Sequence, residues 1–374
     1  MFRPSSILSA RTSVPAPTQA AAVPTRRVAL ADIANTYRQP LGPSAALKKP
    51  ADPIRRPSFS VYQQPTQVSS GAAPALSLPK TASSLIAPTI SAPVTSRPAT
   101  STSVAKLLSV VVEKDRHDPL ANAEYVEEIM SYLYEREATF RCPMYMSTQP
   151  EISEKMRSIL VDWLASVHLK FRLQPETFFL GIKLLDTYLS LKPVSRQKLQ
   201  LMGMVALQIA CKVEEIYSPR MKDWVYMCDK AYTEQEILRT ERAMLGVLSW
   251  NVSVPTVFPF LKRFCKVASV DSKTTQVAFY LTELALGDYK MLKYLPSEIA
   301  AAAVFLAMKM NGQRSWTSLL EQHSRYSEAS LSACVRDLRE LRKAADIASL
   351  QAIRKKYSSS RYEHAALVAL PLSL

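Results

Sequence analysis

Glycine is scarce in this chain, with seven in 374 residues, and none stands in a G-x-G-x-x-G or G-x-x-x-x-G-K-[ST] arrangement. A phosphate-binding loop needs such glycines because the backbone must approach the phosphate closely. The five cysteines form no C-x-x-C pair, and the four histidines show no metal-ligand spacing. These absences argue against a nucleotide-binding loop, a zinc site and a disulfide framework, so we expect no metal, no cofactor and a reducing compartment.

The chain also lacks a run of eighteen apolar residues, so no transmembrane helix is expected. Its first hundred residues lack tryptophan and hold only two acids, against eleven Lys or Arg and fifteen of the twenty-five prolines. This segment therefore carries +9 of the net charge of +15. Such a composition buries too little apolar surface to offset its ordering entropy, which predicts a disordered tail over residues 1–117.

The basic balance raises two further interpretations of this tail. Nucleic-acid binding is not expected, because the basic residues are dispersed rather than clustered with aromatic residues. The basic, acid-poor start is mildly similar to a mitochondrial transit peptide. The many prolines argue against the amphipathic helix that a transit peptide requires.

The rest of the chain shows helical periodicity, most clearly over residues 156–171. Ser153 stands where an N-cap is wanted, and the apolar positions then follow a three-and-four spacing that makes one helical face. They are Met156, Ile159, Leu160, Trp163, Leu164, Val167 and Phe171. A second helix opens at Pro175, and residues 199–213 are apolar nearly all round, which predicts a buried central helix.

The pattern predicts an all-α fold built from two five-helix repeats. Thr233 and Glu236 form a capping box at the start of the last helix of the first repeat, and Pro255 marks the linker. A second set of helices is expected near residues 257–266, 273–287, 296–310, 315–323 and 327–345. We therefore expect an N-terminal helix, opened by Asp118 and Pro119, with the first repeat over 118–255. The second repeat is expected over 256–350, followed by a weakly ordered tail over 351–374.

Three strings within this pattern carry a resemblance to a known family. They are Met156-Arg-Ser-Ile-Leu160, Val161-Asp-Trp-Leu164 and Lys212-Val-Glu-Glu-Ile216. At this spacing the chain resembles the cyclin box, and most closely the mitotic B-type cyclins. The resemblance implies tandem cyclin boxes and a regulatory subunit that activates a cyclin-dependent kinase at the G2/M transition, in nucleus and cytoplasm. The string Phe260-Leu-Lys-Arg-Phe264 favours the B type over the A type.

One short string in the tail resembles the destruction box of mitotic cyclins. It consists of Arg27, Leu30, Ile33 and Asn35 in the pattern R-x-x-L-x-x-I-x-N. The resemblance implies capture by the anaphase-promoting ubiquitin ligase and its co-activators, followed by degradation. The alternative is an incidental helical turn.

The resemblance also implies which residues contact the kinase. Lys212 ends a nearly uncharged helix, and Glu241 lies in the middle of the last helix of the first repeat. In cyclins the matching lysine and glutamate form a pair that hydrogen-bonds the kinase near its mobile αC helix. Without the resemblance, Lys212 is a cation placed favourably at a helix C-terminus. Tyr125, Ile129 and Tyr132 of the N-terminal helix are expected to contact the kinase too, the alternative being a helix that closes its own core.

A substrate-docking patch is the last feature that the resemblance implies, and it would bind substrates or inhibitors with Arg-x-Leu motifs. Its residues would be Met156, Ile159, Leu160, Trp163, Leu199 and Gln200. From periodicity alone such a stripe is more often core. Many cyclins have an acid one turn beyond the Trp, where this chain has Ser166, so docking of the motif's arginine is expected to be weakened.

No catalytic constellation is visible in the sequence, so the chain is not expected to be an enzyme. Glu214 and Glu215 are adjacent, which on a helix points their side chains about 100° apart. Two other classes remain: a DNA-binding double cyclin fold like that of a general transcription factor, and a scaffold that binds no kinase. The first predicts a zinc ribbon ahead of the repeats, and none is present in the sequence.

Overall fold

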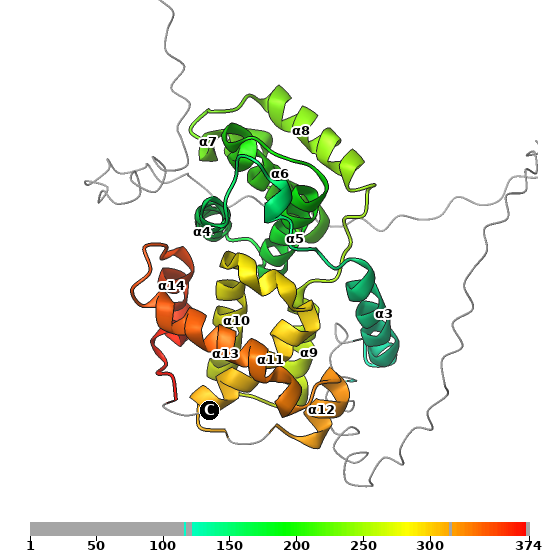
Figure 1. Ribbon diagram of the computed structural model, residues 1–374, viewed down its shortest axis with the longest axis vertical. Coiled ribbons are helices and arrows are strands. Elements are labelled where there is room, and N and C mark those ends of the chain that lie inside the picture. Colours follow the sequence, from blue (N-terminus) through cyan, green and yellow to red (C-terminus); the bar gives the residue numbers. More distant parts are fainter. Residues whose placement is uncertain (1–115, 117–121, 314–315, 372–374) are drawn as a thin grey trace, which may run out of the picture. The chain divides into compact units, whose positions relative to one another are not determined.

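The computed structural model describes residue 116, residues 122–313 and residues 316–371, and all regular structure in these ranges is helical (Figure 1). This confirms the predicted all-α fold class. The string at residues 27–35 lies outside the described residues, as do Asp118 and Pro119, where the N-terminal helix was expected to start. The described helix α3 spans Val126–Thr139.

Two sets of five helices follow α3, as the sequence predicts. The first set consists of α4 (Glu154–Phe171), α5 (Pro175–Leu191), α6 (Leu199–Glu214), α7 (Met221–Met227) and α8 (Glu234–Val247). The second set consists of α9 (Val257–Ala268), α10 (Ser272–Gly287), α11 (Pro296–Met310), α12 (Ser318–Ser324) and α13 (Glu328–Ala345). Short 3₁₀ helices lie at η2 (Met146–Thr148), η3 (Arg196–Lys198) and η4 (Tyr289–Lys293). In Figure 1 the first set is green and the second is yellow to orange.

The helix starts follow from local chemistry that was readable in the sequence. The Ser153 hydroxyl accepts the Met156 N–H at the start of α4. At the start of α8, Thr233 and Glu236 each accept the other's backbone N–H, at 3.2 and 2.9 Å, which is the predicted capping box. Pro175 is the first residue of α5. A backbone N–H at this position has no partner within the helix, so proline, which has no N–H, is tolerated there.

Helices α6 and α11 occupy the centres of the two sets. Every residue from Leu199 to Cys211 in α6 is buried, as is every residue from Ile299 to Met308 in α11. Helix α4 approaches α6 closely at Gly203, where a Cβ atom would lie 2.8 Å from Cδ2 of Leu160. The central helix was therefore predicted correctly, and its glycine permits the close packing of α4.

The prediction of a weakly ordered tail from residue 351 was wrong for the part that the structure describes. Residues Ala352–Tyr357 form helix α14, which packs on α4 and α10, and η5 (Ser360–Tyr362) and η6 (Ala365–Leu367) follow. The Ala352 N–H donates to Oδ1 of Asp162 in α4 at 2.8 Å. Residues 352–367 thus link the first set of helices to the second.

A buried ion pair explains why a lysine-rich segment can pack in this way. Nζ of Lys356 lies 2.6 Å from Oε1 of Glu283, and the two side chains are 2% and 0% exposed. The hydroxyl of Tyr357 donates to the same carboxylate oxygen at 2.7 Å. A charge is tolerated in the interior when it is paired and hydrogen-bonded, and both conditions hold here.

Because Lys356 neutralises a fully buried carboxylate, we expect Lys356→Ala to destabilise the chain by about 3–5 kcal/mol, the usual cost of leaving a buried charge unpaired. Urea unfolding measures this loss. The matched control is Lys355→Ala, since Lys355 is exposed and its removal should change stability by less than about 0.5 kcal/mol. Equal stability of the two variants would contradict a structural role for the buried pair.

Candidate functional site

Helices α6 and α8 bring the two predicted charged residues together. Nζ of Lys212 donates a hydrogen bond to the carboxylate of Glu241. Glu241 is held in place because Ile237 and Met244, on the same side of α8, pack into the core. The Lys212 side chain is 47% exposed and that of Glu241 is 10% exposed. An ammonium carries three N–H donors, so Lys212 can bind its partner in the chain and still donate outward.

Large apolar side chains close to this pair in the sequence are exposed. Leu238 stands three residues before Glu241 on α8, and Val213 follows Lys212 on α6. Ile216 and Tyr217, which follow the C-cap residue Glu215 of α6, are 92% and 91% exposed. Sequence reasoning missed these four residues, although an apolar pair directly after a charged helix end was the signal. We call the six residues Lys212, Val213, Ile216, Tyr217, Leu238 and Glu241 the pair surface.

The segment that presents Ile216 and Tyr217 is fixed to α5. The carboxylate of Glu215 accepts the backbone N–H of Gln174 at 2.7 Å and the hydroxyl of Thr177 at 2.5 Å. The Glu215 carboxylate therefore accepts hydrogen bonds at the N-terminus of α5 and holds the chain after α6 against α5. Exposed apolar side chains on a fixed backbone are typical of a protein-binding surface.

Helix α3 presents a second exposed apolar face. Tyr125, Ile129 and Tyr132 are 58%, 41% and 55% exposed and share one side of the helix. The guanidinium of Arg136 lies 5.5 Å from the centroid of the Tyr132 ring, while its Nη2 donates to the carbonyl of Ser253 in the segment after α8. The predicted N-terminal contact residues are therefore accessible.

The predicted docking patch lies mostly in the core. Leu160 and Leu199 have no exposed surface, and Trp163 and Gln200 are 5% and 7% exposed. Met156 and Ile159 are half-buried. Periodicity could not separate these positions, because a core stripe and the floor of a groove have the same spacing.

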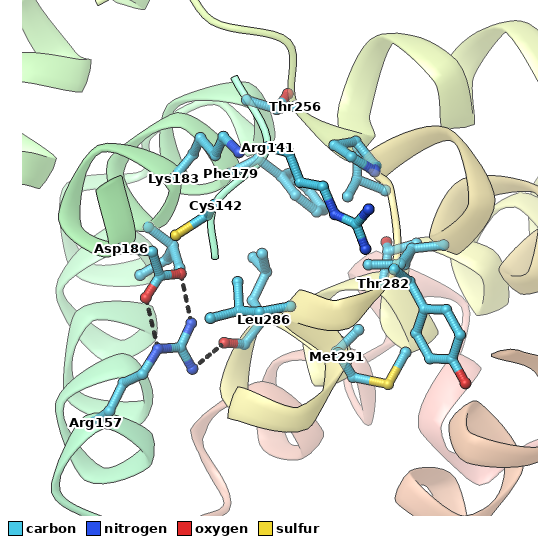
Figure 2. A pocket seen from close by; sticks show the side chains of 17 residues that line it. Arg141, Cys142, Arg157, Phe179, Lys183, Asp186, Thr256, Thr282, Leu286 and Met291 are labelled. Carbon is cyan, nitrogen blue, oxygen red and sulfur yellow. Dashed lines mark hydrogen bonds and ion pairs between the residues drawn. The ribbon is translucent and has the colours of Figure 1, made fainter. Parts of the chain in front are cut away.

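Arg157 supports the interior of the protein. Figure 2 shows its guanidinium between the Asp186 carboxylate and the main-chain carbonyl of Leu286. Nε and Nη2 donate to the two Asp186 oxygens at 2.7 Å each, and Nη1 donates to Leu286 at 3.0 Å. Burial alone lowers the pKa of Arg157, but the adjacent Asp186 carboxylate outweighs it and raises the pKa above its usual range. Arg157 thus joins α4 and α5 to α10.

A cavity of about 70 Å³ adjoins this ion pair, between the two sets of helices. Its lining is mainly apolar, with Phe179, Ile182 and Met291 among the residues (Figure 2). Cys142 also lines it, and burial raises the pKa of this thiol to about 12, so the thiol stays protonated at neutral pH. A protonated thiol beside a saturated ion pair offers no nucleophile.

No group of three or more metal-ligating side chains was found in the parts of the chain that the structure describes. All five cysteines are free and buried. Among the described helices, none combines the length and the apolar character that crossing a membrane requires.

Comparison with known proteins identifies the family. Residues 128–253 match the family described as "Cyclin, N-terminal domain", and residues 255–371 match "Cyclin, C-terminal domain". The chain belongs to the cyclin family. The two matches meet within the segment after α8, so each set of five helices is one cyclin box.

The curated relatives of this cyclin include B-type cyclins. It is 45% identical over 257 residues to Cyclin-B2-2 of Arabidopsis thaliana, which covers 68% of this chain and 60% of the relative. It is 42% identical over 257 residues to G2/mitotic-specific cyclin-B of Dictyostelium discoideum, covering 68% and 59%. The chain thus spans about three fifths of the length of these relatives, and the similarity supports a mitotic B-type cyclin.

A solved structure shares the fold. A viral cyclin from herpesvirus saimiri superposes with a TM-score of 0.53 at 22% identity, covering 59% of this chain and 99% of that chain. At this level of identity the likeness concerns the fold alone.

The cyclin's helix α4 also carries a buried histidine. His168 is 3% exposed, its Nε2 lies 3.0 Å from the carbonyl oxygen of Gln174, and its Nδ1 has no hydrogen-bond partner. Burial, with a smaller effect of the nearby charge of Lys356, lowers the pKa of His168 to about 4, against the opposing effect of Glu283. The imidazole is therefore neutral in the folded cyclin at physiological pH.

Because the pKa of His168 is lowered, the free energy of unfolding depends on pH. Above pH 6.5 the imidazole is neutral in both the folded and the unfolded state, so it adds no pH dependence. Between pH 6.5 and 4 only the unfolded state binds the proton, so stability falls by about 1.4 kcal/mol per pH unit, or about 3 kcal/mol in all. Urea unfolding of wild type and His168→Gln at pH 7 and 5 isolates this contribution, because the variant lacks it. His364→Gln is the matched control, since His364 is exposed; equal pH dependence of all three proteins would contradict the assignment.

Proposed function

We propose that this cyclin binds and allosterically activates a cyclin-dependent protein kinase at the G2/M transition, as a regulatory subunit that is not itself an enzyme. The observation that carries the proposal is the Lys212–Glu241 pair, half-open to solvent, with exposed apolar side chains close to it in the sequence. The name of the Dictyostelium discoideum relative, G2/mitotic-specific cyclin-B, supports the stage of the cell cycle.

The pair surface suits a partner that offers both hydrogen-bond acceptors and apolar side chains. Lys212 would donate to main-chain carbonyls of the kinase near its αC helix, while Glu241 holds the ammonium in one direction. Val213, Leu238 and Ile216 would exclude water around this contact. A charge pair that loses its water on binding contributes more to affinity than an exposed one. Apolar side chains that excluded water from the pair would therefore strengthen the contact.

Activation follows from differential affinity. A cyclin-dependent kinase needs its αC glutamate turned inward, where it pairs with the lysine that positions ATP. A fixed surface that binds only this conformation shifts the equilibrium toward it by the difference in binding free energy between the two states. Glu215 and the core of α8 fix the pair surface in this cyclin, and the chemistry stays on the kinase.

The exposed face of α3 provides a second contact for the kinase. Tyr125, Ile129 and Tyr132 would pack on the kinase lobe that carries αC. Aromatic side chains are enriched among the residues that dominate protein interfaces, because they bury large area with little loss of side-chain entropy.

Substrate docking is proposed at α4. Met156 and Ile159 are the accessible part of the predicted patch, so a substrate with an Arg-x-Leu motif would place its leucine there. The hydroxyl of Ser166, one turn beyond Trp163, donates to the carbonyl of Asp162 at 3.3 Å and brings no charge. The motif's arginine would therefore gain little, and docking would depend on the apolar contact.

The tail gives a proposed route of destruction. Arg27, Leu30, Ile33 and Asn35 would be captured in extended form by the anaphase-promoting ubiquitin ligase and its co-activators, and Lys48, Lys49 and Lys80 are the lysines nearest in sequence. Activity in nucleus and cytoplasm is proposed with this mitotic role.

The kinase contact is tested with Lys212→Ala/Glu241→Ala. Removing a partly desolvated pair from an interface should weaken kinase binding by about 2 kcal/mol, or roughly 30-fold, with loss of histone-kinase activity in pull-downs from dividing cells. The control is Lys343→Ala/Glu340→Ala, because these residues form an ion pair with side chains 54% and 62% exposed, in the second box. Recovery of equal kinase activity with both double variants would sink the site assignment.

The destruction box is tested by the lifetime of the protein at mitotic exit. Arg27→Ala/Leu30→Ala should prolong it, because the receptor would lose both its charged and its apolar contact. Arg55→Ala/Arg56→Ala removes two bases from the same tail outside the motif, and its decay should match wild type. Unchanged decay of the first variant would remove the destruction-box proposal.

A further inference from the structure

Helix α3 has one buried residue, and it is the acid Glu137. Its carboxylate accepts the backbone N–H of Ser297 at 2.9 Å and the hydroxyl of Ser297 at 2.6 Å. Ser297 lies in the first turn of α11, the central helix of the second box, directly after Pro296. The residue at the N-cap of α11 is Leu295, which supplies no side-chain hydrogen bond. Glu137 therefore provides from α3 the acceptor that a capping side chain would give.

Several interactions compensate the buried carboxylate of Glu137. A buried carboxylate is costly unless hydrogen bonds and positive charge compensate it. Burial raises the pKa of Glu137, and the hydrogen bonds from Ser297 and the nearby charge of Lys183 oppose that rise. The N-terminus of α11 adds a favourable helix dipole. The serine is held in turn, because its hydroxyl lies 2.8 Å from that of Tyr326.

Further contacts of α3, all made by Tyr134, also reach the second box. The Tyr134 hydroxyl donates to the carbonyl of His323 at 2.8 Å, and its ring centroid lies 5.1 Å from that of Phe260. The guanidinium of Arg325 lies 4.0 Å from the centroid of the Tyr134 ring. Helix α3 is thus seated on α9, α11 and the end of α12, while Lys212 and Glu241 belong to the first box (Figure 1).

The exposed face of α3 lies roughly a third of a turn around the helix from Glu137. Since a helix is rigid over this length, the contact that fixes one side also sets the direction of the other. We propose that Glu137 is a positioning residue. By capping α11 from α3, it fixes the direction in which Tyr125, Ile129 and Tyr132 meet the kinase, without touching the kinase itself. This inference rests on the proposed function.

Kinase affinity of full-length variants tests the role. Glu137→Ala should weaken binding about tenfold, within the usual range of coupling between sites. Glu137→Gln should restore most of the affinity, because an amide oxygen still accepts the Ser297 N–H. Ser297→Ala approaches the contact from the other side and should weaken binding several-fold. The matched control is Glu135→Ala, since Glu135 is an exposed acid on the same helix.

A double-mutant cycle separates positioning from general loss of stability. Glu137→Ala should have little further effect on affinity once Ile129→Ala/Tyr132→Ala has removed the face, because it acts only through that face. Amide hydrogen exchange should rise over residues 126–140 in Glu137→Ala and stay at the wild-type level in α10 and α13. Additive losses in the cycle, or unchanged exchange in α3, would overturn the positioning role.

Different results would overturn the proposed function and the positioning role of Glu137. A wild-type chain that recruited no kinase would overturn the proposed function and the positioning role with it. Recruitment by wild type that neither Glu137→Ala nor Ser297→Ala weakened would overturn the positioning role alone.

Discussion

The arrangement of the two cyclin boxes depends on the buried guanidinium of Arg157. It donates two hydrogen bonds to Asp186 within the first box and a third to Leu286 in the second. The hydroxyl of Tyr145 donates to the same carboxylate at 2.8 Å, so the Asp186 oxygens are well compensated. A planar donor group with several fixed N–H directions suits such a junction, since it fixes orientation as well as distance. The pair Glu283–Lys356 makes a second buried junction, where α14 packs on α4 and α10.

These junctions matter because the proposed kinase-binding residues are divided between differently anchored elements. The pair surface belongs to α6 and α8 of the first box, whereas α3 is seated on the second box through Glu137 and Tyr134. The affinity of a partner that contacted both the pair surface and α3 would depend on the angle between the boxes. The hydrogen bond from Arg157 to Leu286 and the packing of α14 on α4 link the boxes and keep that angle constant, and a constant surface is what a selective bias between two kinase conformations requires.

Much of this fold was predictable from the sequence because its signals are local. Capping at Thr233, proline at the first position of α5 and the apolar run of α6 each depend on a few neighbouring residues. Lys356 was unpredictable for the opposite reason: a lysine in a basic segment indicates a solvated tail unless its partner, Glu283, is known to lie opposite. The burial of Leu160 against Gly203 likewise depends on a residue more than forty positions away. The exposure of Ile216 and Tyr217 is set by the Glu215 contact with α5, which no periodicity reveals.

Exposure separates the pairs that hold the cyclin together from the pair suited to binding. Arg157 and Lys356 have side chains 1% and 2% exposed and donate to buried carboxylates, so neither can donate outward. Lys212 is bound to a nearly buried carboxylate but is itself 47% exposed. In the buried pairs, the attraction between the two charges offsets the free energy of removing them from water, so removing one partner would lower stability. The Lys212–Glu241 pair would be fully desolvated only in contact with a partner, so under the proposed function it contributes most on binding. In the sequence all three cations have the same appearance, and the depth at which the fold places each one determines whether it serves structure or recognition.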